Sequence, residues 1–256
     1  VLVVLLGLNR YNYVIPLDAS WLRETPIAHR GLHTSEFDEN SLGAFSNAIA
    51  NGYAIELDVR LTKDGAVLVM HDNNLERLLG VKNKVSDMTL AELKQLRFPK
   101  SGESIPTLAD AIALIDGRAP ILVDIKNFGL AGRLEEATLE VMEGYTGEHA
   151  YQSFGPLTCK WMRDHDKITP VGLLLGELPQ MGNRFVRNFK DNLLSAIARP
   201  GLIMYQYDVM TDEITRSYRD HGVTVLGWPV YDDVLRDKSY LRYVDNVIFE
   251  IHPDRQ

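Results

Sequence analysis

Short apolar runs alternate along the chain with longer segments in which apolar residues recur at helical spacing. A run of four to eight apolar and β-branched residues predicts a buried strand, whereas apolar residues at every third or fourth position predict a helix. Eight runs are predicted as strands: Ile27–His29, Ala54–Arg60, Ile121–Ile125, Ala150–Phe154, Val171–Leu175, Leu202–Tyr207, Thr224–Val230 and Val247–Phe249. Strands that alternate with helices favour a parallel sheet with helical crossovers.

Three of the helices between these strands have recognisable beginnings. The pattern predicts a helix from Ser41 onward and another over Gly132–Tyr145, each with its apolar residues on one side. A third is predicted to begin at Thr107, whose hydroxyl can accept from the free backbone amides of a first helical turn.

A hairpin interrupts the alternation after the second strand. The segment "TKDG", Thr62–Gly65, is too short for a crossover helix, and Asp-Gly is a tight-turn signal. We therefore predict that Val67–His71 returns antiparallel to the second strand. This return would bring His71 back toward the strand end that carries Glu56 and Asp58.

The number of strands and the chain length together favour a (β/α)₈ TIM barrel over residues 26–256. A small insertion after the second barrel strand, about residues 62–105, is predicted to contain one short helix with a capping box of Thr89 and Glu92. The alternative is an open doubly wound sheet. A dinucleotide-binding sheet needs three glycines after its first strand, and "HRGLH" has one, so the barrel is preferred.

Composition excludes several classes of protein. Of the 256 residues, 45% are hydrophobic and 24% charged, as in an ordinary globular domain. The net charge of −8 argues against general nucleic-acid binding, which requires a basic surface. Cys159 is the one cysteine, so no disulfide can form within the chain.

The first 25 residues form a segment of their own, which opens with the apolar run "VLVVLLGL". Eight apolar residues are too few to cross a bilayer, which takes about 20. Two interpretations remain: a strap packed on the barrel of a cytoplasmic protein, or the end of a membrane anchor.

Acidic residues gather at the predicted strand ends, where the active site of a barrel assembles. Glu56 and Asp58 share the inward face of the second strand, and Asp124 ends the third. Three converging carboxylates suit a hard cation such as Mg²⁺ or Ca²⁺. The alternative is that they form ion pairs with Arg30, Arg60 and Lys126. For Arg60, which is predicted to lie above the site, an ion-pair role is preferred to a catalytic one.

His29 and His71 also lie at strand ends near these acids. Two imidazoles can serve as general base and general acid at neutral pH. A zinc site is the weaker alternative, because zinc prefers nitrogen and sulfur donors. The other five histidines are predicted to be structural or on the surface: His33, His149, His165, His221 and His252.

Arg30 and Lys126 adjoin the proposed acid-base and metal-binding residues. Both side chains can bind an anionic oxygen through charge-assisted hydrogen bonds. A cation, two histidines and two basic groups together indicate a phosphodiester site. A glycosidase, which needs two carboxylates at a defined separation, would not require them.

The motifs resemble those of the glycerophosphodiester phosphodiesterase family, and they occur in family order across nearly the whole chain after residue 26. The matching stretches are "AHRG" (28–31), "ENS" (39–41), "GYAIELDVRLTKDGAVLVMHD" (52–72), Leu75 and Arg77, "IPTLADAI" (105–112), "VDIK" (123–126), "QSF" (152–154) and "GW-x-V" (227–230).

The resemblance implies a TIM barrel that hydrolyses deacylated phospholipids to sn-glycerol 3-phosphate and an alcohol. It implies His29 and His71 as the acid-base pair and Arg30 and Lys126 as phosphate-binding groups. A divalent cation would be held by Glu56, Asp58 and Asp124. Further residues are expected near the pocket: Glu39, Gln152, Ser153, Phe154 and Trp228. For Trp228, core packing is the alternative.

Three positions depart from the family pattern. Asp38 stands where the family usually has proline. Asp124 replaces the usual glutamate, as in the related sphingomyelinase D-like phospholipases. The C-terminal Thr-Asp-x-Pro signature is replaced by "FEIHP", where Glu250 is a candidate substitute. Two alternative functions therefore remain: a phospholipase D-like lyase acting on lysophospholipid or sphingomyelin, and a non-catalytic phosphodiester-binding domain.

Overall fold

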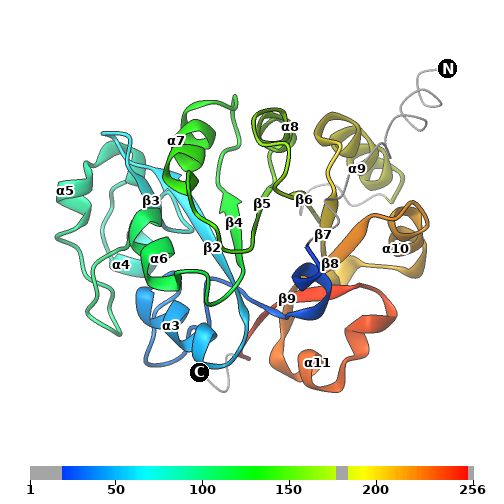
Figure 1. The fold of residues 1–256 in the computed structure, drawn as a ribbon, viewed down its shortest axis with the longest axis horizontal. Helices are drawn as coiled ribbons and strands as arrows, with labels where there is room; N and C mark the ends of the chain where they lie inside the picture. The colour runs from blue at the N-terminus through cyan, green and yellow to red at the C-terminus, as the bar shows by residue number, and fades with distance from the viewer. Residues whose placement is uncertain (1–18, 177–183, 253–256) are drawn as a thin grey trace.

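The computed structural model describes residues 19–176 and 184–252, and in these residues eight parallel strands form a closed barrel (Figure 1). The neighbouring strands β1 and β2 pair in parallel, and β1 also pairs with β9, which closes the ring. The barrel strands are β1 (Ile27–Ala28), β2 (Ala54–Leu61), β4 (Ile121–Ile125), β5 (His149–Ser153), β6 (Val171–Leu175), β7 (Leu202–Gln206), β8 (Thr224–Tyr231) and β9 (Asn246–Glu250). The predicted TIM barrel is confirmed.

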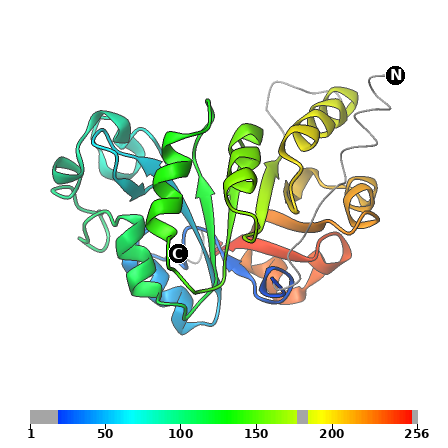
Figure 2. The same cartoon turned by 45° about the horizontal axis from the view of Figure 1, so that its top comes forward.

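Helices surround this barrel, as the turned view in Figure 2 shows. Their bounds are α3 (Leu42–Ala50), α6 (Leu108–Ile115), α7 (Arg133–Met142), α8 (Pro156–His165), α9 (Arg184–Ala198), α10 (Asp212–Arg219) and α11 (Asp232–Asp237), with short 3-10 turns η2 (Tyr207–Val209) and η3 (Ser239–Arg242). The predicted helix beginnings are confirmed. Ser41 accepts from the amide of Ala44 at 3.1 Å, and Thr107 forms a capping box with Asp110.

The alternation of β2 separates the two sides of the barrel wall. Ile55, Leu57 and Val59 are buried in the apolar layer between the strands and the helices. Glu56 and Asp58 therefore point to the barrel interior. This is the division that the sequence pattern predicts.

A short helix, α2 (Trp21–Glu24), packs on the apolar core inside the barrel. Its residues Trp21 and Leu22 are buried there, and the Asn246 amide donates to the carbonyls of Leu22 and Thr25 at 3.1 and 2.7 Å. The apolar run that prompted the strap-or-anchor prediction falls within residues 1–18, outside the described part of the chain. Among the described helices, none has the length and apolar character needed to cross a membrane.

The predicted hairpin is present. Strand β3 (Val67–Val69) pairs antiparallel with the end of β2, with Val69 opposite Val59 and Val67 opposite Leu61. The turn residue Gly65 has φ of 89°, a left-handed conformation that glycine adopts without strain.

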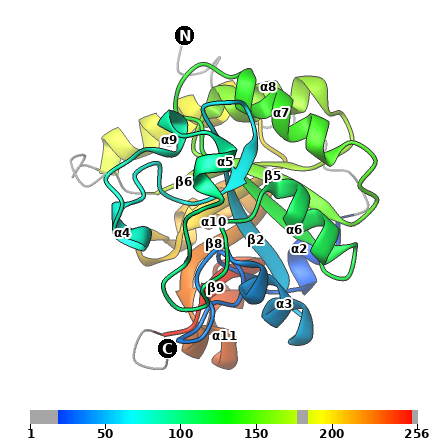
Figure 3. The ribbon, with the colours of Figure 1, turned by 90° about the vertical axis from the view of Figure 1, so that its left-hand side faces the viewer.

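The insertion contains more helical turns than predicted. Besides the expected α5 (Leu90–Leu93), capped by Thr89 and Glu92, it has α4 (Glu76–Leu79) and the 3-10 turn η1 (Val85–Asp87). These turns are too short to produce a helical repeat of apolar residues. The insertion lies on one side of the barrel (Figure 3) and has a small core of its own: Leu68, Met70, Leu75, Val85, Leu93, Phe98 and Ile105.

Candidate active site

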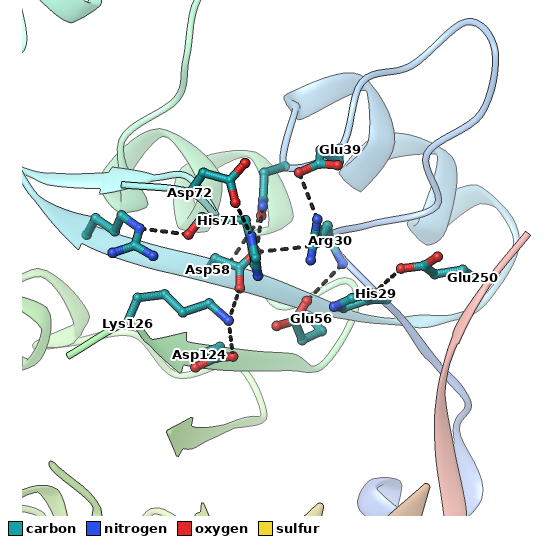
Figure 4. Close-up of polar contacts among 12 residues, drawn as sticks. His29, Arg30, Glu39, Glu56, Asp58, His71, Asp72, Asp124, Lys126 and Glu250 are labelled. Atoms are coloured by element: carbon teal, nitrogen blue, oxygen red, sulfur yellow. Dashed lines mark hydrogen bonds and ion pairs between the residues drawn. The ribbon is translucent and has the colours of Figure 1, made fainter. Parts of the chain in front are cut away.

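Three buried carboxylates meet inside the barrel near the carboxyl ends of two adjacent strands. Asp58 of β2 and Asp124 of β4 are register partners, and Glu56 lies two residues before Asp58 on the same strand face. Their exposures are 1% for Glu56, 0% for Asp58 and 2% for Asp124. One oxygen of each lies within 4.8 Å of the others. Figure 4 shows the three side chains converging.

The charge of this cluster is only partly balanced by the protein. Burial raises the pKa of Glu56 well above its usual value, and the charges of Asp58 and Asp124 add to this effect. Burial likewise raises the pKa of Asp124. Among the described residues, no hydrogen-bond partner exists for the buried Oδ1 of Asp124. An all-oxygen cluster short of positive charge, with a free buried acceptor, fits a divalent cation.

Lys126 supplies part of the missing positive charge. Its Nζ lies 2.8 Å from Oδ1 of Asp58 and 2.6 Å from Oδ2 of Asp124, with 6% of the side chain exposed. Burial alone would lower the pKa of Lys126, but these two carboxylates raise it above its usual value. In Asp58, burial would raise the pKa, but Lys126 and other cationic neighbours lower it. The ion-pair interpretation of the acids thus holds for Asp58 and Asp124.

The turn after β1 places Arg30 across the cluster from Lys126. Arg30 has φ of 56° and precedes Gly31 with φ of 77°, so two successive left-handed residues reverse the chain. The Arg30 amide donates to Oε2 of Glu56 at 2.8 Å. Its guanidinium donates to Glu39 at 2.9 Å, and its Nε lies 3.6 Å from Asp58. Both the backbone and the side chain of Arg30 therefore hold acids of the site.

Asn40 is a site residue that the sequence reasoning missed. It has φ of 58°, its Nδ2 donates to Oδ2 of Asp58 at 2.7 Å, and its Oδ1 accepts from the Asp58 amide at 3.2 Å. The asparagine of "ENS" could have indicated a left-handed turn at this position, because asparagine adopts left-handed conformations more readily than most residues. Asn40 thus fixes the orientation of one of the proposed ligands.

His29 is held by a carboxylate from the last barrel strand. Its Nδ1 is paired with Oε1 of Glu250, at the end of β9 (Figure 4). Burial alone would raise the pKa of Glu250, but the hydrogen bond and charge of His29 lower it to about 2. The residue considered as a substitute for the missing C-terminal signature therefore contacts the first proposed catalytic histidine.

His71 is also paired with a carboxylate through Nδ1, and that carboxylate is in turn paired with an arginine. Its Nδ1 lies 2.6 Å from Oδ1 of Asp72, whose Oδ2 accepts from Arg77 Nε at 2.5 Å. Arg77 also donates through Nη1 to Glu39 at 3.0 Å. Burial lowers the pKa of His71, which favours the neutral imidazole. Asp72 and Arg77 were not predicted as site residues, although both lie within quoted motifs.

The prediction that Arg60 is an ion-pair partner is wrong. In the described part of the chain no carboxylate lies within ion-pair distance of its guanidinium. Its Nε instead donates to the backbone carbonyl of His71 at 2.7 Å. The antiparallel return of β3 brings that carbonyl back beside the end of β2, where a charged partner had been expected.

The four remaining pocket candidates have different surroundings. Gln152 is buried and donates to Oε1 of Glu56 at 3.3 Å. The Ser153 hydroxyl donates to the Ile125 carbonyl at 2.7 Å, so it ties β5 to β4. Phe154 and Trp228 form an edge-on ring pair with centroids 5.4 Å apart, and both pack on the inner core of the barrel. The two aromatic residues therefore cover that core on the side of Lys126, whose Nζ lies 5.9 Å from the Phe154 ring.

His33 lies nearer the site than predicted. Burial lowers its pKa, and it is close enough to Glu250, Glu39 and His29 for their charges to act on it. The prediction that His33 is structural or on the surface did not include these charged neighbours. Its position follows from the tight turn after β1, which the sequence pattern did not specify.

The fold and these contacts agree with comparisons to known proteins. The model of the glycerophosphoryl diester phosphodiesterase family matches residues 29–249. A curated relative, the glycerophosphodiester phosphodiesterase of Caldanaerobacter subterraneus subsp. tengcongensis, is 36% identical over 163 residues, which are 58% of this chain and 65% of the relative.

Two solved structures extend the comparison to the whole barrel. The glycerophosphodiester phosphodiesterase of Thermotoga maritima has a TM-score of 0.70 and 29% identity, covering 88% of this chain and 94% of its own. An Oleispira antarctica phosphodiesterase in complex with the product sn-glycerol-3-phosphate has a TM-score of 0.75 and 23% identity, covering 88% and 92%. At that identity the second likeness concerns the fold alone.

Proposed function

We propose, because this chain belongs to the glycerophosphoryl diester phosphodiesterase family, that it hydrolyses glycerophosphodiesters to sn-glycerol 3-phosphate and an alcohol with the help of a divalent cation. Family membership makes the chain a phosphodiester hydrolase. The substrate, the cation and the roles of individual residues constitute the proposal.

One observation supports the proposed hydrolysis most strongly. Three buried carboxylates with an unsatisfied acceptor oxygen lie beside two histidines, and each histidine is held through Nδ1 by a further carboxylate. A binding domain would not need two imidazoles fixed in this way. The same arrangement is suited to proton transfer next to a phosphate.

Glu56, Asp58 and Asp124 would hold the cation. Mg²⁺ or Ca²⁺ suits these ligands better than zinc, because all three donors are carboxylate oxygens. When bound, the cation supplies the positive charge that stabilises the anionic phosphate during the reaction. Lys126 already pairs with two of these acids, so in the proposed complex it lies at the border between the carboxylates and the phosphate.

His29 and His71 are the proposed acid-base pair. Because a carboxylate occupies Nδ1 of each ring, Nε2 is the atom left to exchange a proton with the substrate or with water. Glu250 and Asp72 are positioning residues that select this orientation. The lowered pKa of His71 favours the neutral form, which suits a general base, and His29 is then the general acid.

Arg30 is the proposed phosphate-binding arginine, together with Lys126. Its guanidinium is oriented by Glu39, and a planar guanidinium binds two phosphate oxygens in a defined direction. Trp228 and Phe154 would cover the apolar side of the bound glycerol.

The test is release of sn-glycerol 3-phosphate from glycerophosphocholine and glycerophosphoethanolamine, measured with Mg²⁺, with Ca²⁺ and with a chelator. We expect the chelator to abolish release and His29→Ala to reduce kcat by about 10²- to 10⁴-fold. His221→Ala, which changes an exposed histidine on another part of the barrel, is the matched control and should keep its activity. Phosphorus NMR identifies the product: a cyclic phosphate would assign the lyase reaction instead, and no turnover with any cation would leave only a binding role.

A further inference from the structure

A cavity lined by basic residues adjoins the proposed active site. It has a volume of about 550 Å³ and lies between the end of β2, the loop after β4, the start of α7 and η1 of the insertion. Its charged lining residues are Arg60, Lys126 and Arg133, and no acidic residue occurs in its described lining. This local excess of positive charge contrasts with the net charge of −8 for the chain.

Arg60 is available to a ligand in this cavity. Its Nε is used by the carbonyl of His71, but among the described residues no carboxylate pairs with the guanidinium. Arg60 also lines a second cavity of about 560 Å³ beside Asp72 and Arg77. A bound anion would pair with a guanidinium that has no ion-pair partner within the described ranges.

Arg133 also lines this cavity, at the first position of α7. A cation at this end of a helix is unfavourable, because the helix dipole is positive there. Within the described ranges Arg133 has no ion-pair partner. The helix end is instead capped by Glu135, which accepts from the Gly132 amide at 2.8 Å. Helix stability therefore does not explain why an arginine occupies this position.

We infer that this cavity binds the alcohol part of the substrate and recognises an anionic group on it, such as a carboxylate. The inference rests on the proposed function, because it places the phosphate next to Lys126, which borders both the carboxylate cluster and the cavity. Arg60 and Arg133 would bind the anionic group. Asn73 and Ser86, which also line the cavity, offer neutral donors to the rest of the alcohol.

Glycerophosphoserine and glycerophosphoethanolamine test this directly, because their alcohols differ by one carboxylate. We expect the full chain to favour glycerophosphoserine by about tenfold or more in kcat/KM, as one charge-assisted hydrogen-bonded pair would give. Arg133→Met should reduce this preference about tenfold, and Arg133→Lys should restore part of it. Arg60→Lys should lower activity on both substrates, because Arg60 also holds His71, and should reduce the preference as well.

Arg216→Met is the matched control, since Arg216 is an exposed arginine of α10 that is outside the cavity lining. Equal kcat/KM for the two substrates, or a preference that Arg133→Met leaves intact, would overturn the inference while leaving the proposed hydrolysis standing. If no glycerophosphodiester is turned over, the proposed function fails instead. Calorimetric titration of His29→Ala with both compounds then still decides whether the carboxylate improves binding.

Discussion

Glu250→Gln is expected to slow hydrolysis by about 10- to 30-fold without preventing folding. Glutamine keeps an oxygen that can accept from Nδ1 of His29 but removes the negative charge. The fall of the Glu250 pKa from 4.5 to about 2 corresponds to about 3 kcal/mol of favourable interaction. Because the side chain is 24% exposed, solvent screening reduces this to about 1.5–2 kcal/mol. If the interaction of Glu250 with His29 loses that energy, the rate falls by the stated factor.

The assay is the pH dependence of kcat/KM for glycerophosphoethanolamine, compared among Glu250→Gln, Glu250→Asp and the unchanged chain. Glu250→Gln should have a lower kcat/KM than the unchanged chain across the pH range, because Nδ1 of His29 has lost its charged acceptor, and Glu250→Asp should recover part of the rate. Glu140→Gln, at an exposed position of α7, is the control. Identical rates and profiles for the glutamine variant and the unchanged chain would refute the reasoning.

The same substitution should affect stability in a defined pH range. Because folding depresses the pKa of Glu250, its contribution is fully present above its usual value of 4.5 and is lost as the pH falls toward about 2. The difference in unfolding free energy between the unchanged chain and Glu250→Gln should therefore shrink between pH 5 and pH 3 in urea titrations. A difference that stays constant over this range would show that the carboxylate charge is not its origin.

Other substitutions test the remaining supports of the site. Asp38→Ala removes the acceptor of the Ser101 amide (2.9 Å) and hydroxyl (3.0 Å), and should lower the unfolding free energy by about 2–4 kcal/mol in urea; no loss would mean that the insertion is held elsewhere. Glu56→Gln should abolish the rise in melting temperature that Ca²⁺ or Mg²⁺ produces, whereas an undiminished rise would place the cation at another site. Gly31→Ala should cost about 1–3 kcal/mol, because φ is 77° and a Cβ would lie 2.9 Å from Phe45; a neutral result would mean that the turn can relax.

The barrel was predictable from the sequence because its signals are local. Each strand is a short apolar run, and two of the predicted helix starts, Ser41 and Thr107, have a capping residue whose hydroxyl accepts from the first turn. The division of β2 into an outer apolar face and an inner acidic face follows from the two-residue period of a strand. These features depend on residues close together in sequence, so no knowledge of distant contacts was needed.

The partners of the site residues were harder to predict because they come from distant parts of the chain. Glu250 reaches His29 only because β9 pairs with β1 and closes the barrel. Asn40 reaches Asp58 only because the turn after β1 adopts left-handed conformations, which a hydrophobic pattern does not record. Arg60 was assigned the wrong partner for a different reason: its partner is a backbone carbonyl of the nearby hairpin, and a backbone carbonyl carries no signal in the sequence.

The placement of Asp38 shows how a departure from a family pattern can be compensated. Proline would restrict the loop before Glu39 through its ring. Asp38 is 1% exposed and instead accepts hydrogen bonds from Lys100 and Ser101 in the insertion. The loop is thus held by contacts with the insertion rather than by its own backbone.

The formal charges explain why cation and substrate should bind together in the proposed complex. Glu56, Asp58 and Asp124 carry three negative charges, and Lys126 and Arg30 contribute two positive ones, which leaves one negative charge. A divalent cation alone would reverse this to one positive charge, and a phosphodiester anion would then bring the sum to zero. The raised pKa values of Glu56 and Asp124 agree with this deficit of positive charge in the protein alone. Because each ligand corrects the imbalance left by the other, each should increase the affinity of the site for its partner.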